Sequence, residues 1–380
     1  MRRLIIFIFS TVLFVNCTSE KEKTCLLIGK VVDRNSKTLI LKKETEDSRS
    51  RDIEIQIDSS GFFKYELKFQ FVEAYELIFK DELERGAWRP ILFFPDNDTI
   101  EFTLYPMHMA DNNKITGSQL SLEESKYNQV IREIYYGKYV YWNQKLDSLT
   151  NINETDSDYA IQAADSINGI LNAIPQFELK YATNNANLYG YNKFLNILRN
   201  EKELRLFSMD TLKKYHEIFQ QMYPNHPYNE ISEYRLAGLI NIKVGGSYVD
   251  FTASDSTGRK IIISNYIAQN KYTLLDLWAP WCGPCIKKSH QILPIYDQYK
   301  NSGFGVIGIV GGIGNHEHFL QAIKKYNYPW TVLSEINNQN DLWERYSISK
   351  SGGSQFLVDN VGKILAINPS PEELKKIILE

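Results

Sequence analysis

The sequence predicts a multi-domain protein with an N-terminal antiparallel β-sandwich or barrel, a central α-helical region and a C-terminal α/β domain. Short β-branched and aromatic runs separated by turn signals occupy residues 25–118. Apolar residues at three- and four-residue steps follow through 119–240, which is typical of helices. Strand and helix patterns then alternate through 241–380, which indicates one sheet with helices on its faces. A chain of 380 residues is long enough for several domains.

The first 16 residues are expected to be a secretory signal peptide outside the fold. Two arginines precede an apolar stretch of twelve residues, Leu4 to Val15, which is too short to span a membrane. The stretch is followed by Cys17 in a pattern that resembles a lipoprotein signal, so we expect Cys17 to carry a lipid anchor. Asn16 departs from the small residue usual before that cysteine, and an ordinary signal peptide is the alternative. Residues 17–24 are short and polar and are expected to form a tether.

The N-terminal strands are expected to be short. Ile53–Ile57 alternates strictly between apolar and polar residues, and Asp58–Gly61 is a turn signal before the next strand. Cys25 begins an apolar run, so a packed core thiol is favoured over a resolving redox role. The expected strands are Leu26–Val32, Lys37–Lys43, Ile53–Ile57, Phe62–Leu67, Ala74–Phe79, Pro90–Phe94 and Thr99–Leu104.

An aromatic stripe at helical spacing marks the start of the central region. Its members are Tyr127, Val130, Ile131, Ile134, Tyr135, Tyr141, Trp142, Leu146 and Leu149. Such a stripe could line a ligand groove, but it is more often a core face, which is the interpretation adopted here. A second helix is expected from Asp158 towards Asn184, with Pro175 kinking or dividing it. Further helices are expected at Tyr191–Arg199 and Thr211–Met222.

The C-terminal elements alternate between strand and helix. A hairpin is expected around Phe251 and Lys260–Ile263, and Tyr272–Trp278 is expected to be a central strand. The later strands are Gly305–Val310, Trp330–Leu333, Gln355–Val358 and Lys363–Ile367. The expected helices are Lys287–Tyr299, Glu317–Tyr326, Gln339–Tyr346 and Pro371–Leu379.

Two cysteines spaced C-x-x-C follow the central strand. Cys282 is expected at the exposed N-terminus of the next helix, with Cys285 one turn in, because Pro284 suits a first helical turn and Gly283 a tight turn. Unpaired N–H groups at a helix N-terminus stabilise a thiolate. A bare C-x-x-C also serves zinc sites, but no second C-x-x-C follows, so no metal and no cofactor are expected.

Two neighbours of these cysteines favour redox chemistry. Trp281 directly precedes Cys282, where its ring can shield the dithiol. Asp276 lies six residues before Cys282, on the expected central strand. If that strand points at the site, Asp276 is a buried carboxylate of raised pKa that can accept the proton of Cys285.

The segment Asp276–Cys285 resembles the thioredoxin active site almost residue for residue. Its surroundings are more similar to the extracytoplasmic TlpA/ResA-like branch of that family, at Val244–Thr252, Gly303–Ile309 and Phe356–Ile364. The resemblance covers about residues 243–380 and implies a thioredoxin fold with a redox-active Cys282–Cys285 pair. The N-terminal β-rich region resembles the small β-domain of unknown function that precedes such domains in lipoproteins, at Ile28–Lys30, Asp58–Phe62, Phe94–Asp98 and Ile115–Gly117.

The sequence departs from that family in the loop expected to face the dithiol. The family carries a cis-proline three residues before the aromatic residue of the final hairpin, and counting back from Phe356 gives Gly353. A cis peptide before a non-proline residue costs about 2.5–4 kcal/mol, so we expect a trans peptide here. Glycines still allow close approach of a substrate backbone. The candidate substrate-binding residues are Trp281, Gly283, Pro284, Gly352 and Gly353.

The function favoured by these patterns is an envelope-anchored thiol–disulfide oxidoreductase that reduces disulfides of exported proteins. Cys282 would attack the substrate, Cys285 would resolve the mixed disulfide, and Asp276 would manage the proton. Expected partners are protein thiols and disulfides, a membrane-bound electron donor, and the membrane through the lipid anchor. The net charge of −3 gives no reason to expect nucleic acid. The alternatives are a thiol peroxidase and a non-catalytic binding or scaffold lipoprotein with a vestigial redox domain.

Overall fold

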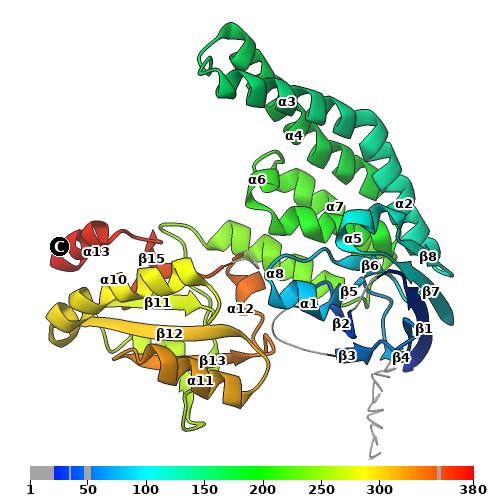
Figure 1. The fold of residues 1–380 in the computed structure, drawn as a ribbon. Helices are drawn as coiled ribbons and strands as arrows, with labels where there is room; N and C mark the ends of the chain where they lie inside the picture. Colours follow the sequence, from blue (N-terminus) through cyan, green and yellow to red (C-terminus); the bar gives the residue numbers. More distant parts are fainter. Residues whose placement is uncertain (1–20, 34–35, 47–52, 349–351) are drawn as a thin grey trace, which may run out of the picture.

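The computed structural model describes residues 21–33, 36–46, 53–348 and 352–380 (Figure 1). The expected signal peptide and the expected lipid anchor at Cys17 lie outside these residues. In Figure 1 the N-terminal sheets lie at one side of the molecule, helices rise above them, and the C-terminal α/β unit lies at the other side.

Two four-stranded sheets form the N-terminal region and share one apolar core. The first has the order β4-β1-β7-β8 and consists of β1 (Lys23–Val31), β4 (Phe62–Phe69), β7 (Thr99–Leu104) and β8 (Lys114–Thr116). The second has the order β3-β2-β5-β6 and consists of β2 (Thr38–Lys43), β3 (Ile53–Gln56), β5 (Tyr75–Phe79) and β6 (Ile91–Phe93). Helix α1 (Lys80–Glu84) and the 3-10 helix η1 (Met107–Asn112) lie in the connections between strands. Cys25 on β1 is fully buried, and burial raises the pKa of its thiol to about 11, so it is the packed core thiol that was predicted.

The prediction of an antiparallel N-terminal domain is wrong for one strand pair. Strands β1 and β7 run parallel, with Leu26 opposite Thr99 and Val31 opposite Leu104. The chain leaves the first sheet after β4, passes through β5 and β6 of the second sheet, and returns in the direction of β1. Parallel neighbours need such a long crossover, which the residue pattern within single strands does not reveal.

The central region is helical, as predicted. It consists of α2 (Gln119–Ile131), the π-helix η2 (Arg132–Tyr136), α3 (Gly137–Asn151), α4 (Asp158–Asn184), α5 (Leu188–Arg199), α6 (Glu201–Leu204), α7 (Met209–Met222) and α8 (Tyr228–Asn241). Helix α4 begins after the N-cap Ser157, whose side chain accepts the N–H of Ala160, and it runs through Pro175 without being divided. Tyr191 of α5 stacks on Phe219 of α7 at 4.6 Å between ring centroids, within the core of this region.

The aromatic stripe divides into a buried and an exposed part. Tyr127 on α2 is buried against aromatic side chains of α4 and α5, so the core interpretation is correct there. It is wrong for α3, which buries no side chain and leaves Tyr141 51% exposed. Figure 1 shows the physical reason, because the hairpin of α3 and α4 projects away from the rest of the molecule.

The C-terminal region contains one seven-stranded sheet in the order β10-β9-β13-β12-β11-β14-β15. Strands β11, β12 and β13 run parallel, and β14 runs antiparallel to β11. The strands are β9 (Thr252–Ser254), β10 (Lys260–Ile262), β11 (Tyr272–Trp278), β12 (Phe304–Ile313), β13 (Thr331–Ile336), β14 (Ser354–Asp359) and β15 (Ile364–Ile367). The helices are α9 (Ile263–Ile267), α10 (Gly283–Tyr299), the 3-10 helix η3 (Lys300–Ser302), α11 (His316–Tyr326), α12 (Leu342–Arg345) and α13 (Pro371–Leu379).

Both faces of this sheet are covered. Leu274 on β11 packs in a core with α10 and α13, whereas the next residue, Leu275, packs in a core with α9 and α12. Successive strand residues point to opposite faces, so β11 is buried on both sides and has an almost continuous apolar sequence. Within the described residues, no helix is both long and apolar enough to cross a bilayer.

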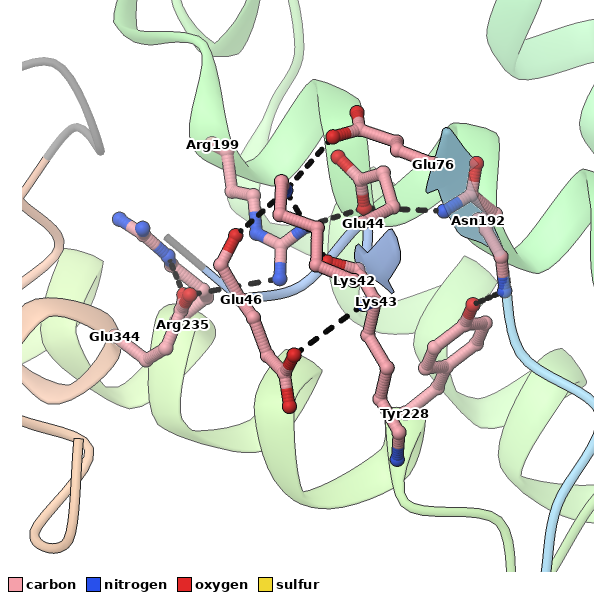
Figure 2. Close-up of polar contacts among 11 residues, drawn as sticks. Lys42, Lys43, Glu44, Glu46, Glu76, Asn192, Arg199, Tyr228, Arg235 and Glu344 are labelled. Carbon is pink, nitrogen blue, oxygen red and sulfur yellow. Dashed lines mark hydrogen bonds and ion pairs between the residues drawn. The ribbon is translucent and has the colours of Figure 1, made fainter. Parts of the chain in front are cut away.

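A cluster of charged side chains joins the three regions (Figure 2). Glu44, which follows β2, accepts hydrogen bonds from Arg199 of α5 at 3.0 Å and from Asn192 at 3.3 Å. Arg199 also lies 3.5 Å from a carboxylate oxygen of Glu344 on α12, and Arg235 of α8 pairs with the other oxygen of Glu344. The N-terminal sheets, the helices and the C-terminal region are therefore connected by one buried ionic network, drawn in Figure 2.

Candidate active site

The disulfide lies where β11 meets α10. Strand β11 ends at Trp278, a short turn follows, and Cys282 is the N-cap residue of α10. The Cys282 sulfur accepts a hydrogen bond from the N–H of Cys285 at 3.3 Å, so one of the N–H groups in the first turn of the helix points at this sulfur. Pro284 sits in the first turn, where its missing N–H costs nothing and its fixed φ suits the helix.

Cys282 and Cys285 are joined by a disulfide and are buried. Cys282 is 5% exposed and Cys285 is 8% exposed, so the expectation that Cys282 stands at an exposed helix end is wrong for this oxidised form. Both cysteines belong to an apolar cluster with Trp278, and the partly buried Trp281 packs against this cluster. The position of Cys282 at the helix N-terminus does not predict the burial of the disulfide, which comes from side chains of the preceding turn and of other elements.

Asp276 is a buried carboxylate on β11. Its Oδ2 accepts a hydrogen bond from Ser289 Oγ at 2.6 Å, and its Oδ1 accepts one from Gln355 Nε2 at 3.1 Å. Burial raises the pKa of Asp276 to about 6, although these two hydrogen bonds favour the charged form. Its burial and raised pKa are as predicted from the strand pattern.

A small cavity of about 130 Å³ joins the carboxylate to the sulfurs. Its lining includes Asp276, Cys282, Cys285, Pro284, Lys288 and Gly353. A cavity of this size is large enough for water, which needs only about 10–15 Å³ of accessible space. The arrangement therefore allows a proton to pass between Asp276 and Cys285 without direct contact.

The Gly352–Gly353 loop lies against the disulfide, as its position before the final hairpin predicted. The N–H of Gly353 donates to Cys285 Sγ at 3.1 Å. No peptide bond among the described residues is cis, so the bond before Gly353 is trans as expected. A Cβ atom at Gly353 would overlap the carbonyl oxygen of Leu277. Proline has no place here, because it would remove the N–H group and add atoms where the backbone of β11 lies.

Hydrogen bonds from α8 and α12 also hold the Gly352–Gly353 loop and the segment before it. Trp343 Nε1 donates to the carbonyl of Gly352 at 2.8 Å. Arg235 of α8 donates to the carbonyl of Ile348 at 2.8 Å, and its own carbonyl accepts Ser347 Oγ at 3.1 Å. Helix α8 thus anchors the backbone that leads into the loop.

Three residues near the site were missed by the sequence analysis. Ser289 lies four residues after Cys285, one helical turn further along the same face, and this spacing could have shown it. Gln355 lies two residues after Gly353 and could have been placed opposite Asp276 by pairing β14 with β11. No local signal identifies Trp343, because its contact with Gly352 depends on how α12 packs.

Comparison with known proteins identifies the C-terminal region. Residues 244–367 match the model of the AhpC/TSA family. The chain carries an AhpC/TSA domain. This domain contains Asp276, both cysteines of the disulfide and Gly353, and it has a thioredoxin-like fold.

Relatives of the AhpC/TSA domain include thiol–disulfide oxidoreductases. The chain is 25% identical over 134 residues to "Thiol-disulfide oxidoreductase ResA" of Bacillus subtilis, which covers 34% of this chain and 70% of that protein. It is 25% identical over 128 residues to the protein of the same name from Geobacillus thermodenitrificans, with 33% and 69% covered. It is also 28% identical over 141 residues to "Peroxiredoxin Q, chloroplastic" of Triticum aestivum, with 32% and 63% covered.

Solved structures similar to the AhpC/TSA domain carry related names. One is the thioredoxin domain of a thiol-disulfide oxidoreductase from Bacteroides vulgatus, at 24% identity and a TM-score of 0.33, covering 37% of this chain and 97% of that one. Another is a thiol-disulfide oxidoreductase from Bacteroides fragilis, at 26% identity and a TM-score of 0.31, covering 35% and 97%.

Proposed function

We propose that the protein is an envelope-anchored thiol–disulfide oxidoreductase that reduces disulfides of exported proteins. One observation carries the proposal: the Cys282–Cys285 disulfide at a helix N-terminus shares a cavity with a buried carboxylate whose pKa is raised to about 6. A vestigial redox domain would have no need of a destabilising buried charge beside its cysteines.

The reaction starts from the reduced pair. The Cys282 thiolate attacks one sulfur of the substrate disulfide, the substrate S–S bond breaks, and one substrate sulfur leaves as a thiolate. Cys285 then loses its proton, and its thiolate attacks Cys282 Sγ. The mixed disulfide breaks, the second substrate thiolate leaves, and the Cys282–Cys285 bond forms. Two electrons pass from the pair to the substrate, and water protonates the departing thiolates.

Asp276 is assigned the role of base for Cys285. A pKa of about 6 keeps the carboxyl mostly ionised at pH 7 and still able to take a proton. The shared cavity supports transfer through water, because it borders both Asp276 and Cys285. Ser289 and Gln355 act as positioning residues, since each donates to one oxygen of this carboxylate.

The substrate is assigned to the surface around the disulfide. Gly283 and Pro284 are exposed at the start of α10, and Trp281 lies beside them. A Cβ atom at Gly352 would meet open space, which leaves room for a substrate backbone. We include Gly353 in this surface, because its N–H contacts Cys285 Sγ.

Turnover requires a dithiol that returns two electrons to the oxidised pair. We assign this step to a membrane-bound electron donor, which is supported by the resemblance of residues 243–380 to TlpA/ResA-like proteins. The thiol peroxidase alternative gains weight from the peroxiredoxin relative and from the family match. Against it, the two cysteines lie three residues apart and already form an internal disulfide.

Mixed-disulfide trapping tests the proposed chemistry. The reduced chain should reduce insulin or a disulfide-linked peptide, and Cys285→Ala should accumulate a covalent Cys282–substrate adduct that dithiothreitol removes. Cys282→Ala is the matched control and should form no adduct. Rapid consumption of peroxide without reduction of any disulfide would instead support the peroxidase alternative.

Anchoring through Cys17 is the second part of the proposal. It rests on the N-terminal sequence pattern, in which a short apolar stretch is followed by a cysteine. The expressed chain should partition with membranes and incorporate labelled fatty acid, and Cys17→Ser should abolish the label. A wild-type chain found entirely in the soluble fraction without label would rule the anchor out.

A further inference from the structure

A cleft of about 570 Å³ lies between the central helices and the C-terminal domain, and we call it the interdomain cleft. One wall comes from α5, α6, α7 and α8. The other comes from residues 346–348, from 352–354, from β14 and from the end of β15. Its volume lies within the roughly 300–1,000 Å³ typical of ligand-binding sites.

The interdomain cleft shares four lining residues with the small cavity beside the disulfide. Gly352, Gly353, Ser354 and Asn368 line both this cleft and the small cavity that contains the sulfurs. Gly353 also donates its N–H to Cys285, so this glycine lines the interdomain cleft and contacts the reactive pair. A bound disulfide at Cys282 would place its neighbouring residues at the mouth of the interdomain cleft.

The helical wall is apolar and incompletely covered. Five of its side chains pack against a core on one side and remain partly exposed: Leu204, Phe207, Met209, Leu239 and Ile242. Covering such surface with a ligand contributes about 25 cal/mol per Å² of apolar area. This wall therefore favours an apolar side chain of the ligand.

The charged side chains among the described residues that line the cleft are three arginines. Arg199 and Arg235 are buried and hold Glu44 and Glu344, so they are already neutralised. Arg205 is exposed on the rim, and in the part of the chain that the structure describes it forms no ion pair. No Asp or Glu appears among the described residues that line the cleft. The rim thus attracts a carboxylate.

We infer that the interdomain cleft binds the segment of a protein substrate next to its disulfide, with an apolar side chain on the helical wall and an acidic side chain at Arg205. The inference rests on the proposed function and names its substrate class: disulfides in acidic and apolar sequence surroundings. The central helices then supply substrate selection, while the AhpC/TSA domain supplies the chemistry.

Two disulfide-linked peptides test this inference with the full-length reduced protein. One has Phe and Glu beside its cysteine, and the other has Ser and Lys at the same positions. Wild type should show a kcat/KM about tenfold higher for the first peptide, which is the scale of one apolar pocket contact plus one charge. Arg205→Glu and Phe207→Ser should each lower the ratio of the two kcat/KM values, the first by losing the charge attraction and the second by losing the apolar contact.

Lys213→Glu on α7 is the matched control, because it makes the same charge change at an exposed residue that does not line the cleft. It should keep the wild-type ratio. Equal kcat/KM values for the two peptides in wild type, or an unchanged ratio in Arg205→Glu, would overturn the inference and leave the proposed function intact. No turnover of either peptide would overturn the proposed function, and the inference with it.

Discussion

Asp276→Asn should give a protein that is more stable at pH 7 and slower in resolving its mixed disulfide. Burial raises the pKa of Asp276 from 3.8 to about 6, a shift of about two units. Such a shift means that the ionised carboxylate costs the fold about 3 kcal/mol at neutral pH. Asparagine carries no charge and keeps the shape of the side chain, so most of this cost should disappear.

The pH dependence of this gain has a definite sign. The folded protein holds the Asp276 proton more tightly than the unfolded chain, so wild-type stability falls as the pH rises from about 4 through 6. Variant and wild type should therefore differ little below pH 4 and most above pH 7. Urea unfolding at several pH values measures the difference. Asp297→Asn, at an exposed residue of α10, is the control and should change stability by less than about 0.5 kcal/mol.

The kinetic effect should be confined to the second step. Without the carboxylate, deprotonation of Cys285 relies on solvent, and the mixed disulfide should decay about 100-fold more slowly at pH 7. The first attack by Cys282 should be nearly unchanged, since it does not need Asp276. Rapid-quench trapping separates the two steps. Loss of the first attack would show that Asp276 is structural, and a lower stability at pH 7 would contradict the cost assigned to its charge.

Arg199→Met should destabilise the whole chain by about 3–5 kcal/mol, because it removes a buried cation from Glu44 and leaves Glu344 with Arg235 alone of the two arginines. Arg199 is 7% exposed and lies between Glu44 of the N-terminal region and Glu344 of the C-terminal region. Methionine keeps most of the apolar stem, so the loss reports charge rather than volume. Because the network joins three regions, unfolding should also separate into more than one transition.

Two further variants make the Arg199 result specific. Arg85→Met removes a cation whose pair with Asp81 is exposed, and it should cost less than about 1 kcal/mol. Adding Glu44→Gln to Arg199→Met should restore part of the lost stability, because a buried carboxylate that has lost the Arg199 cation is then replaced by a neutral amide. Denaturant unfolding followed by fluorescence and by circular dichroism measures all four proteins. Equal effects of Arg199→Met and Arg85→Met would mean that the network contributes no more than a surface pair.

Local chemistry explains what could be predicted from the sequence. The position of Cys282 at the start of α10 follows from the residues within a few positions of it, and the burial of Asp276 follows from its apolar strand. Pairings between distant segments were not predictable in the same way. The parallel partner of β1 depends on the path through a second sheet, and the exposure of Tyr141 depends on where the α3–α4 hairpin points.

Within the site, the contacts of Gly353 also depend on a segment that is distant in the sequence. Its place in the sequence predicted that it would face the dithiol, yet the reason for glycine is the carbonyl of Leu277, which is far away in the sequence. The interdomain cleft has no sequence signature, because its walls come from segments about 150 residues apart, for example Leu198 and Ser347.

The hydrogen bonds between Arg235 and the segment at Ser347 and Ile348 make the AhpC/TSA domain depend on a helix outside it. The AhpC/TSA match begins at residue 244, just after α8 ends, so the donor that holds the segment before the Gly352–Gly353 loop lies outside the domain. Gly238 on α8 also has no room for a Cβ atom, because Ser347 and Arg345 lie against it. The redox domain is therefore not an interchangeable module. A domain cut at its sequence boundary would lose the helix that supports this loop.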